Sequence, residues 1–270
     1  MALDKERPWW LELRKLHDEQ FVFDWRSHVK RLNSTYSFDF STPDGLAPPW
    51  FNGDVEALEP GNWVLVVSLN PQLDVKLQGW YATGKFDTDL YWHHWRTHNR
   101  RRYYPGFFRP LVMVASGALG QSVSKDEERD FATRRMCFVE VCPYASATFD
   151  LTPEQVKQLV AEDVGFGVKT QVREMMIEQA RPRIVLVNGN PAVDAMEAVH
   201  EEKLAWEEWE QYPAGSPEGR MLWWRRGMYR GPHRVPVVGF PFLNKPRTAR
   251  SHDDYQQLGR MINALAEKGN

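Results

Sequence analysis

The sequence predicts an α/β protein, a three-layer α/β/α sandwich around a central, mostly parallel, four-stranded sheet. Four short apolar segments have the length and β-branched content of buried strands, and segments with helical periodicity separate them. Strands that alternate with helices imply parallel βαβ units. We expect one domain over residues 1–270, with residues 1–60 as an N-terminal helical extension and residues 212–232 as an insertion before the last strand.

The expected elements follow one another in a regular order. The strands are Trp63–Ser68, Met136–Val141, Arg183–Val187 and Val235–Gly239. The helices have amphipathic or small, apolar patterns and are Phe108–Leu119, Thr152–Leu159, Lys169–Ala180, Ala192–His200 and Ser251–Lys268. The hydroxyls of Thr152 and Ser251 are expected N-caps, because a helical pattern begins directly after each of them.

Composition excludes several classes of protein. The chain has no apolar run long enough to span a membrane and no signal-peptide pattern, so we expect a cytoplasmic protein without a membrane partner. Two cysteines are too few for an iron–sulfur cluster or a structural zinc without other ligands, and His93, His94 and His98 lack a spacing that completes a metal site. No glycine-rich phosphate loop is present. We therefore predict no metal, no cofactor and no protein partner.

The loops that follow the four strands are the expected place for chemistry. In a parallel sheet the carboxyl ends of the strands share one edge, and ligands bind there. Asn70 ends the first strand before Pro71, which interrupts the ladder, so Asn70 is either an active-site group or a turn former. The substrate-binding candidates in these loops are Ser68, Pro71, Gln72, Tyr144, Asn188 and Asn244.

The order of these loops resembles the uracil-DNA glycosylase superfamily. The segment SLNPQ at 68–72 is similar to the Gly-x-Asn-Pro-Gly motif of the mismatch-specific branch, and FVEVCPYAS at 138–146 is similar to the Asn-x-Cys-Pro-Leu motif of the single-strand-selective branch. The segment GFPFLNKPRTARS at 239–251 occupies the place of the His-Pro-Ser-Pro loop. The resemblance runs from about residue 61 to the C-terminus and implies hydrolysis of the N-glycosidic bond of a flipped base, without metal or cofactor.

The resemblance implies a role for Asn70. Glycosidic cleavage passes through an oxocarbenium-like sugar, so the enzyme needs a group that orients water and donors that stabilise the departing base. The amide of Asn70 is our candidate for positioning the water. No lysine lies in the motif loops near Asn70 or Glu140, apart from Lys245, so we expect a monofunctional enzyme.

Glu140 stands where uracil-specific enzymes have an asparagine that reads the base. An ionised carboxylate repels the O4 acceptor of uracil and accepts a hydrogen bond from the exocyclic amine of cytosine, whereas a protonated one would also donate to the cytosine N3. Glu140 therefore favours an aminopyrimidine; the alternative is a salt-bridged strand end with no role in the pocket. We list Glu140 with Asn70 as a catalytic-site residue.

Two further departures from the family pattern concern the pocket. Phe240-Pro241 replaces the His-Pro pair, so the donor to the leaving base has to come from another residue; the candidates are Asn244, Arg247, Arg250 and His252. Because Gln72 follows Pro71, no aromatic directly blocks the C5 substituent of the base, and Trp80 or Tyr81 is expected to stack on it. This favours 5-hydroxymethylcytosine or its glucosylated form, which mark certain phage genomes; bacterial superfamily members that attack them are defence proteins.

The basic residues indicate DNA as the partner, although the net charge is only −2. The DNA-binding candidates are Arg100, Arg101, Arg102, Lys245, Arg247, Arg250 and His252, and Trp223, Trp224 and Arg247 are candidates for the wedge that enters the duplex. Two alternatives stay open: a repair glycosylase for uracil or a deaminated base, and a catalytically silent nucleic-acid-binding module.

Overall fold

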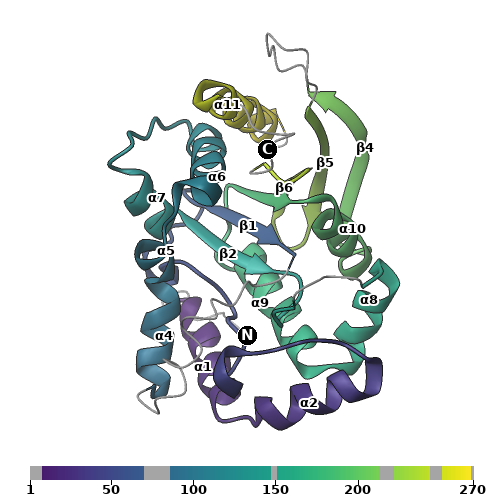
Figure 1. Cartoon of the computed structure of the whole chain (residues 1–270). Helices are drawn as coiled ribbons and strands as arrows, with labels where there is room; N and C mark the ends of the chain where they lie inside the picture. The colour runs from purple at the N-terminus through teal and green to yellow at the C-terminus, as the bar shows by residue number, and fades with distance from the viewer. Residues whose placement is uncertain (1–7, 70–85, 147–150, 213–221, 244–250, 269–270) are drawn as a thin grey trace, which may run out of the picture.

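The computed structural model describes residues 8–69, 86–146, 151–212, 222–243 and 251–268, and Figure 1 shows their arrangement. A six-stranded mixed sheet forms the centre, with strand order β2-β1-β3-β6-β5-β4. The strands are β1 (Val64–Ser68), β2 (Met136–Glu140), β3 (Ile184–Asn188), β4 (Leu204–Tyr212), β5 (Leu222–Arg230) and β6 (Arg234–Phe240). The general α/β prediction is therefore confirmed, and the four expected strands correspond to β1, β2, β3 and β6.

The prediction of a four-stranded sheet is wrong, because the hairpin β4–β5 adds two antiparallel strands to β6. This hairpin begins at Leu204, so residues 222–230 of the expected insertion belong to the sheet itself. The guanidinium of Arg225 binds the carboxylate of Glu197 with two hydrogen bonds of 2.6 and 3.0 Å, which fixes the hairpin to the neighbouring helix. The cationic group of Arg225 also lies 5.4 Å from the ring centre of Trp206.

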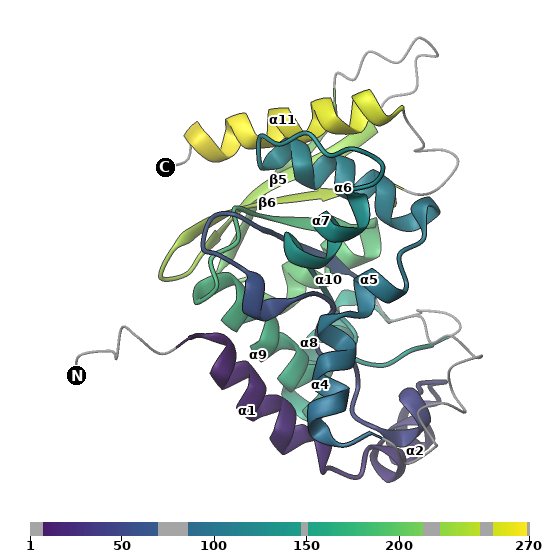
Figure 2. The same ribbon diagram turned by 90° about the vertical axis from the view of Figure 1, so that its left-hand side faces the viewer.

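Helices cover both faces of the sheet. They are α1 (Trp10–Phe21), α2 (Trp25–Tyr36), α4 (Thr88–Arg96), α5 (His98–Arg101), α6 (Pro105–Ala118), α7 (Glu128–Arg134), α8 (Pro153–Glu162), α9 (Val164–Glu178), α10 (Asn190–Val199) and α11 (His252–Lys268), with short 3₁₀ turns at Pro43–Gly45 and Val55–Ala57. Figure 2 shows α6 and α11 on one side of the sheet and α1, α8 and α9 on the other.

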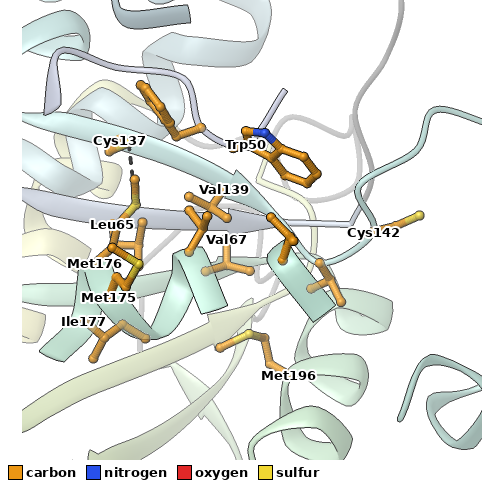
Figure 3. Packing of buried hydrophobic residues seen from close by; sticks show 14 of the residues in the cluster. Trp50, Leu65, Val67, Cys137, Val139, Cys142, Met175, Met176, Ile177 and Met196 are labelled. Carbon is orange, nitrogen blue, oxygen red and sulfur yellow. Dashed lines mark hydrogen bonds between the residues drawn. The ribbon is translucent and has the colours of Figure 1, made fainter. Parts of the chain in front are cut away.

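Alternation along the parallel strands divides the core into two clusters. Leu65 and Val67 of β1 point to the side of α8, α9 and α10, whereas Val64 and Val66 point to the side of α6 and α11. Figure 3 shows the first cluster, where the thiol of Cys137 lies 3.9 Å from the thioether of a methionine in α9. Because both faces are covered, these strands are almost entirely apolar, which is the pattern that the sequence showed.

The N-terminal segment packs into the first of these clusters. Residues of α1 and α2, and several between positions 47 and 58, are buried in it, including Trp50 and Phe51 at 1% exposure. Asn52 also exchanges backbone hydrogen bonds of 2.9 and 2.8 Å with Phe138, so this segment pairs with the edge of β2. The described part of this segment, residues 8–60, therefore contributes directly to the core and to one border of the sheet.

Two glycines allow α6 and α11 to approach closely. Gly117 of α6 and Gly259 of α11 face each other, and a Cβ atom at Gly259 would overlap the carbonyl oxygen of Val114 and the Cα of Gly117. At the start of α11 the expected N-cap is confirmed, since the backbone N–H of Asp254 donates to the Ser251 hydroxyl and the N–H of Ser251 donates to the Asp254 carboxylate. The contact between these two helices closes the second face of the sheet.

We predict that Gly259→Ala lowers the free energy of unfolding by about 1–3 kcal/mol, because the added methyl group forces the two helices apart. Gly167→Ala in α9 is the matched control. Its Cβ would meet only the Val160 carbonyl at 3.4 Å, so helix propensity makes this change neutral or stabilising by up to about 1 kcal/mol. Urea denaturation followed by circular dichroism measures both; equal effects would disprove close packing at Gly259.

Candidate functional site

The order of the parallel strands creates a crevice between β1 and β3. The chain leaves β1 toward β2 on one side and leaves β3 through α10 toward β4 on the other, so the connections leave these two neighbouring strands in opposite directions. In open α/β sheets, ligands bind at such a switch point, outside the carboxyl ends of the strands. Ser68 and Asn188 are the last residues of β1 and β3. The site that the sequence predicted is therefore the site that the topology favours.

At the end of β1, the chain stays paired with the segment that follows β2. Val141 donates its backbone N–H to Ser68 at 2.8 Å, and Cys142 donates to Leu69 at 2.8 Å. The Ser68 hydroxyl is buried and has no hydrogen-bond partner within the described part of the chain. Asn70, the next residue after Leu69, lies outside the described residues, as do Pro71, Gln72, Trp80 and Tyr81.

Glu140 ends β2 beside Ser68, its register partner on β1, and is only 7% exposed. One carboxylate oxygen lies 2.7 Å from the ammonium nitrogen of Lys169, and the other lies 3.4 Å from the amide nitrogen of Asn52, which donates to it. Lys169 also donates to the carbonyl oxygen of Pro49. Since both oxygens of Glu140 face donors, neither oxygen needs a proton, and the pair is an ion pair.

The sequence reasoning considered only lysines within the motif loops, and the lysine that the structure places against Glu140 comes from α9, outside those loops. Lys169 is fully buried on α9, and Arg173, one turn further along, is fully buried too. Arg173 donates to the backbone carbonyls of Glu140 and Val141 at 3.0 and 3.2 Å, so it satisfies acceptors at the end of β2. The sequence carried one local signal of this burial, which was missed. Lys169 and Arg173 are four residues apart, so they lie on one face of the helix, and that face also carries the apolar side chains of Val172 and Met176.

Burial controls the electrostatics of this cluster. It lowers the pKa of Lys169, while the nearby Glu140 carboxylate acts in the opposite direction. Burial also lowers the pKa of Arg173 to about 10, so the guanidinium stays charged at neutral pH. Two buried cations thus stand behind one buried carboxylate, which favours a negative charge on Glu140.

Asn188 holds the last loop against the end of β3. It is 1% exposed, and its side-chain oxygen accepts the backbone N–H of Leu243 at 3.2 Å. The next residue, Gly189, has φ of +111°, and a Cβ there would overlap the ring of Phe242. Phe240, at the end of β6, is fully buried and offers no polar group. The candidates Asn244, Lys245, Arg247 and Arg250 lie outside the described residues.

Tyr144 has a different position from the one predicted. Its ring is fully buried, and its hydroxyl donates to Asp163 at 2.8 Å. The second carboxylate oxygen of Asp163 lies 2.6 Å from Nε2 of His28, so these three side chains join the loop after β2, the start of α9 and α2. Tyr144, predicted as a substrate-binding residue, is therefore part of the core in this arrangement.

The basic candidates that the structure describes lie on the surface. Arg100 and Arg101 of α5 and the adjacent Arg102 are exposed, and so is His252 at the first position of α11. Asn99, also on α5, donates to the backbone carbonyl of Asn52 at 3.2 Å. Because Asn52 pairs with Phe138 of β2, α5 lies on the β2 side of the sheet.

Other predicted residues divide between surface and core. Trp223 is 45% exposed, whereas Trp224 is 4% exposed and packs in the second core cluster, so only Trp223 is accessible for a wedge. Burial lowers the pKa of His94 to about 3 and that of His98 to about 4, which keeps both imidazoles neutral at pH 7. Among the described residues, no group of three or more histidines, cysteines and carboxylates is close enough to hold a metal ion.

No protein-family model matches the chain, and no curated protein matches it either. Of the helices that the structure describes, none combines the length and the apolar character that are needed to cross a bilayer.

We predict that Lys169→Met lowers the free energy of unfolding by about 3–5 kcal/mol, because it leaves Glu140 as an uncompensated charge in the interior. The double variant Glu140→Gln/Lys169→Met should lose less than the sum of the two single variants. Lys157→Met is the control, since Lys157 pairs with Glu201 at the exposed surface and should change stability by less than about 1 kcal/mol. Chemical denaturation of the four variants measures the coupling, and additive effects would disprove the ion pair.

Proposed function

We propose that this protein is a DNA glycosylase that hydrolyses the N-glycosidic bond of a flipped, modified cytosine. The substrate class is a cytosine enlarged at C5, such as glucosylated 5-hydroxymethylcytosine in phage DNA, and the abasic sites that result would serve as an antiviral defence. The observation that carries the proposal is the ion-paired carboxylate of Glu140 at the carboxyl edge of the sheet. Glu140 is level with Ser68, the last residue of β1, and Asn70 follows Ser68 by two residues in the chain.

The charge of Glu140 determines which base it would read. Cytosine presents an amino group at the position where uracil presents a carbonyl oxygen. A carboxylate that Lys169 keeps ionised accepts a hydrogen bond from that amino group and repels the carbonyl oxygen. Of the two protonation states considered for Glu140, the ion pair supports the ionised one, which would accept from the exocyclic amine. The same ion pair is what the alternative of a salt-bridged strand end with no role in the pocket predicts, and the cleavage assay with Glu140→Gln separates the two.

The catalytic step in this proposal is attack of water on the anomeric carbon. Asn70 would orient the water through its amide, the bond from C1′ to the base nitrogen would break with its electrons going to the base, and the base would then take up a proton. The hydroxyl of Ser68, two residues before Asn70, is buried without a hydrogen-bond partner among the described residues, and in this proposal it would contact the substrate or the water. Lys169 is fully buried and engaged by Glu140 and Pro49, which disfavours a Schiff base at this lysine and supports a monofunctional reaction.

A catalytically silent nucleic-acid-binding module is the second candidate, and one observation favours it. Phe240 is fully buried, so the position that supplies a donor to the leaving base in the family supplies none here. A module of this kind would bind DNA through the exposed arginines of α5 without cleaving any base. The repair glycosylase for uracil has no comparable support, because the ion pair of Glu140 opposes it.

We predict that the purified protein forms abasic sites in duplexes that carry glucosylated 5-hydroxymethylcytosine and forms none in duplexes that carry uracil. Single-turnover incubation followed by mild alkali measures this with four duplexes, which contain uracil, cytosine, 5-hydroxymethylcytosine or the glucosylated base. Asn70→Ala should slow the reaction by at least about 10²-fold, because the water is no longer oriented. Glu140→Gln should slow the reaction as well. The glutamine side chain can turn its NH₂ group, rather than its oxygen, toward the exocyclic amine of cytosine, and two donors cannot form a hydrogen bond.

Glu128→Gln is the matched control, since Glu128 is also a buried carboxylate paired with a cation, Arg109, at 2.7 Å, but lies away from the strand ends. Thermal melting of each variant separates loss of activity from loss of folding. Cleavage of the uracil duplex by the unmodified protein would disprove recognition of an amino group. Failure to cleave any of the four duplexes, with DNA binding retained, would favour the binding module.

We also predict that Arg100→Gln/Arg101→Gln weakens binding to duplex DNA of any sequence and lowers the slope of log K against log salt by about 1 to 2, because two phosphate contacts are lost. Lys15→Gln/Lys30→Gln removes the same charge from the exposed faces of α1 and α2 and should leave the slope unchanged. Fluorescence anisotropy at several salt concentrations measures both variants. An equal loss in the two would mean that α5 has no special part in DNA binding.

A further inference from the structure

A cavity of about 280 Å³ lies at the amino edge of the sheet, the border opposite the predicted glycosylase site. The turn before β1, the segment between α9 and β3, and the start of β6 line it. The strands between the two edges have five to seven residues, which separates the cavity from the strand carboxyl ends by roughly 15–20 Å. A ligand in this cavity is therefore distinct from a base bound at the switch point.

The charged side chains that line the cavity are all basic. Arg181 and Arg234 are exposed, Arg183 and His233 are half-buried, and no carboxylate belongs to the lining. Within the described residues, neither Arg181 nor Arg234 has a salt-bridge partner. The cavity therefore brings two guanidinium groups without a described carboxylate partner to one concave surface, in a chain whose net charge is only −2.

The acceptors around the cavity are already engaged. The carbonyl oxygen of Arg181 accepts the N–H of Gly61 at 2.7 Å, and that of Ala180 accepts the indole N–H of Trp63 at 3.0 Å. Glu59, the carboxylate that precedes Pro60 in the chain, accepts from Asn62 at 3.1 Å and lies 3.6 Å from Arg135. The charged groups that line the cavity therefore face no carboxylate of the lining, and the nearby Glu59 is engaged elsewhere.

The backbone of the cavity is rigid. Pro60, Pro182 and Pro236 line it, and each fixes its own φ angle. The side chain of Arg183 is held by a hydrogen bond of 2.9 Å to Asn263 of α11. A site whose donors are fixed before binding loses less conformational entropy when a ligand arrives.

We propose that this cavity binds the phosphate groups of a small phosphorylated molecule. Guanidinium groups match phosphate oxygens with paired, charge-assisted hydrogen bonds, and Arg181 and Arg234 are free to supply them from two sides. The volume lies at the lower end of the range for small-molecule sites, about 300–1,000 Å³, which suits a compact ligand such as a diphosphate or a mononucleotide. The concave shape favours such a ligand over the backbone of a duplex.

Titration calorimetry with pyrophosphate, AMP and a 20-base-pair duplex tests the proposal on the full chain. Pyrophosphate or AMP should bind saturably, and Arg181→Gln/Arg234→Gln should weaken that binding at least about tenfold, because two charge-assisted hydrogen-bonding groups are removed. The control is Arg129→Gln/Arg134→Gln, which removes the same charge from the exposed face of α7 and should leave the affinity unchanged. Far-ultraviolet circular dichroism checks that both variants fold.

Three results would overturn the proposal. The first is that neither pyrophosphate nor AMP binds saturably. The second is that the cavity variant and the control variant bind these anions with equal affinity. The third is that the cavity variant loses binding to the duplex while its binding of pyrophosphate persists. The last result would assign these arginines to a DNA surface. None of the three depends on base excision, so the proposed glycosylase activity can fail while this site stands.

Discussion

The buried ion pair between Glu140 and Lys169 is the interaction on which the arrangement of the functional edge depends. It joins the end of β2 to α9, and through Pro49 and Asn52 it joins both to the N-terminal segment. A buried carboxylate without a partner is strongly destabilising, so these three segments have to come together for any of them to be stable. The polar edge of the sheet is thus a product of tertiary packing around one charge.

The N-terminal segment helps to form the carboxyl edge of the sheet through the same contacts. It covers the border of β2 through Asn52, supplies Trp50 and Phe51 to the core, and is bound a second time where His28 meets Asp163. Residues that are far apart in the chain, before β1 and after β2, therefore shape a single site. A fragment that begins at the sheet would lack both the cover of β2 and one of the donors to Glu140.

The sequence allowed β1, β2, β3 and β6 to be predicted, because strands buried on both faces are continuous apolar runs. It did not reveal β4. In β4 tryptophans alternate with glutamates, a pattern that also suits a solvated surface, and the pairing with β5 shifts register between Trp206 and Trp209. The position of Glu140 at a strand end was predicted to within one residue, since the apolar run indicated a strand over Met136–Val141 and β2 ends at Glu140. Its partner was not, because Lys169 lies 29 residues away and only the packing of α9 brings the two together.

The hairpin β4–β5 also affects how this sheet meets other chains. An unpaired strand at the border of a sheet is a template for association with another molecule, and apolar borders are the most prone to aggregate. Here the border of β2 is paired with Asn52, and the opposite border is β4, whose exposed Glu207 and Glu208 repel a second copy of the same strand. The apolar strand β6 is enclosed between β3 and β5, so the hairpin that interrupts the parallel pattern also protects the sheet against self-association.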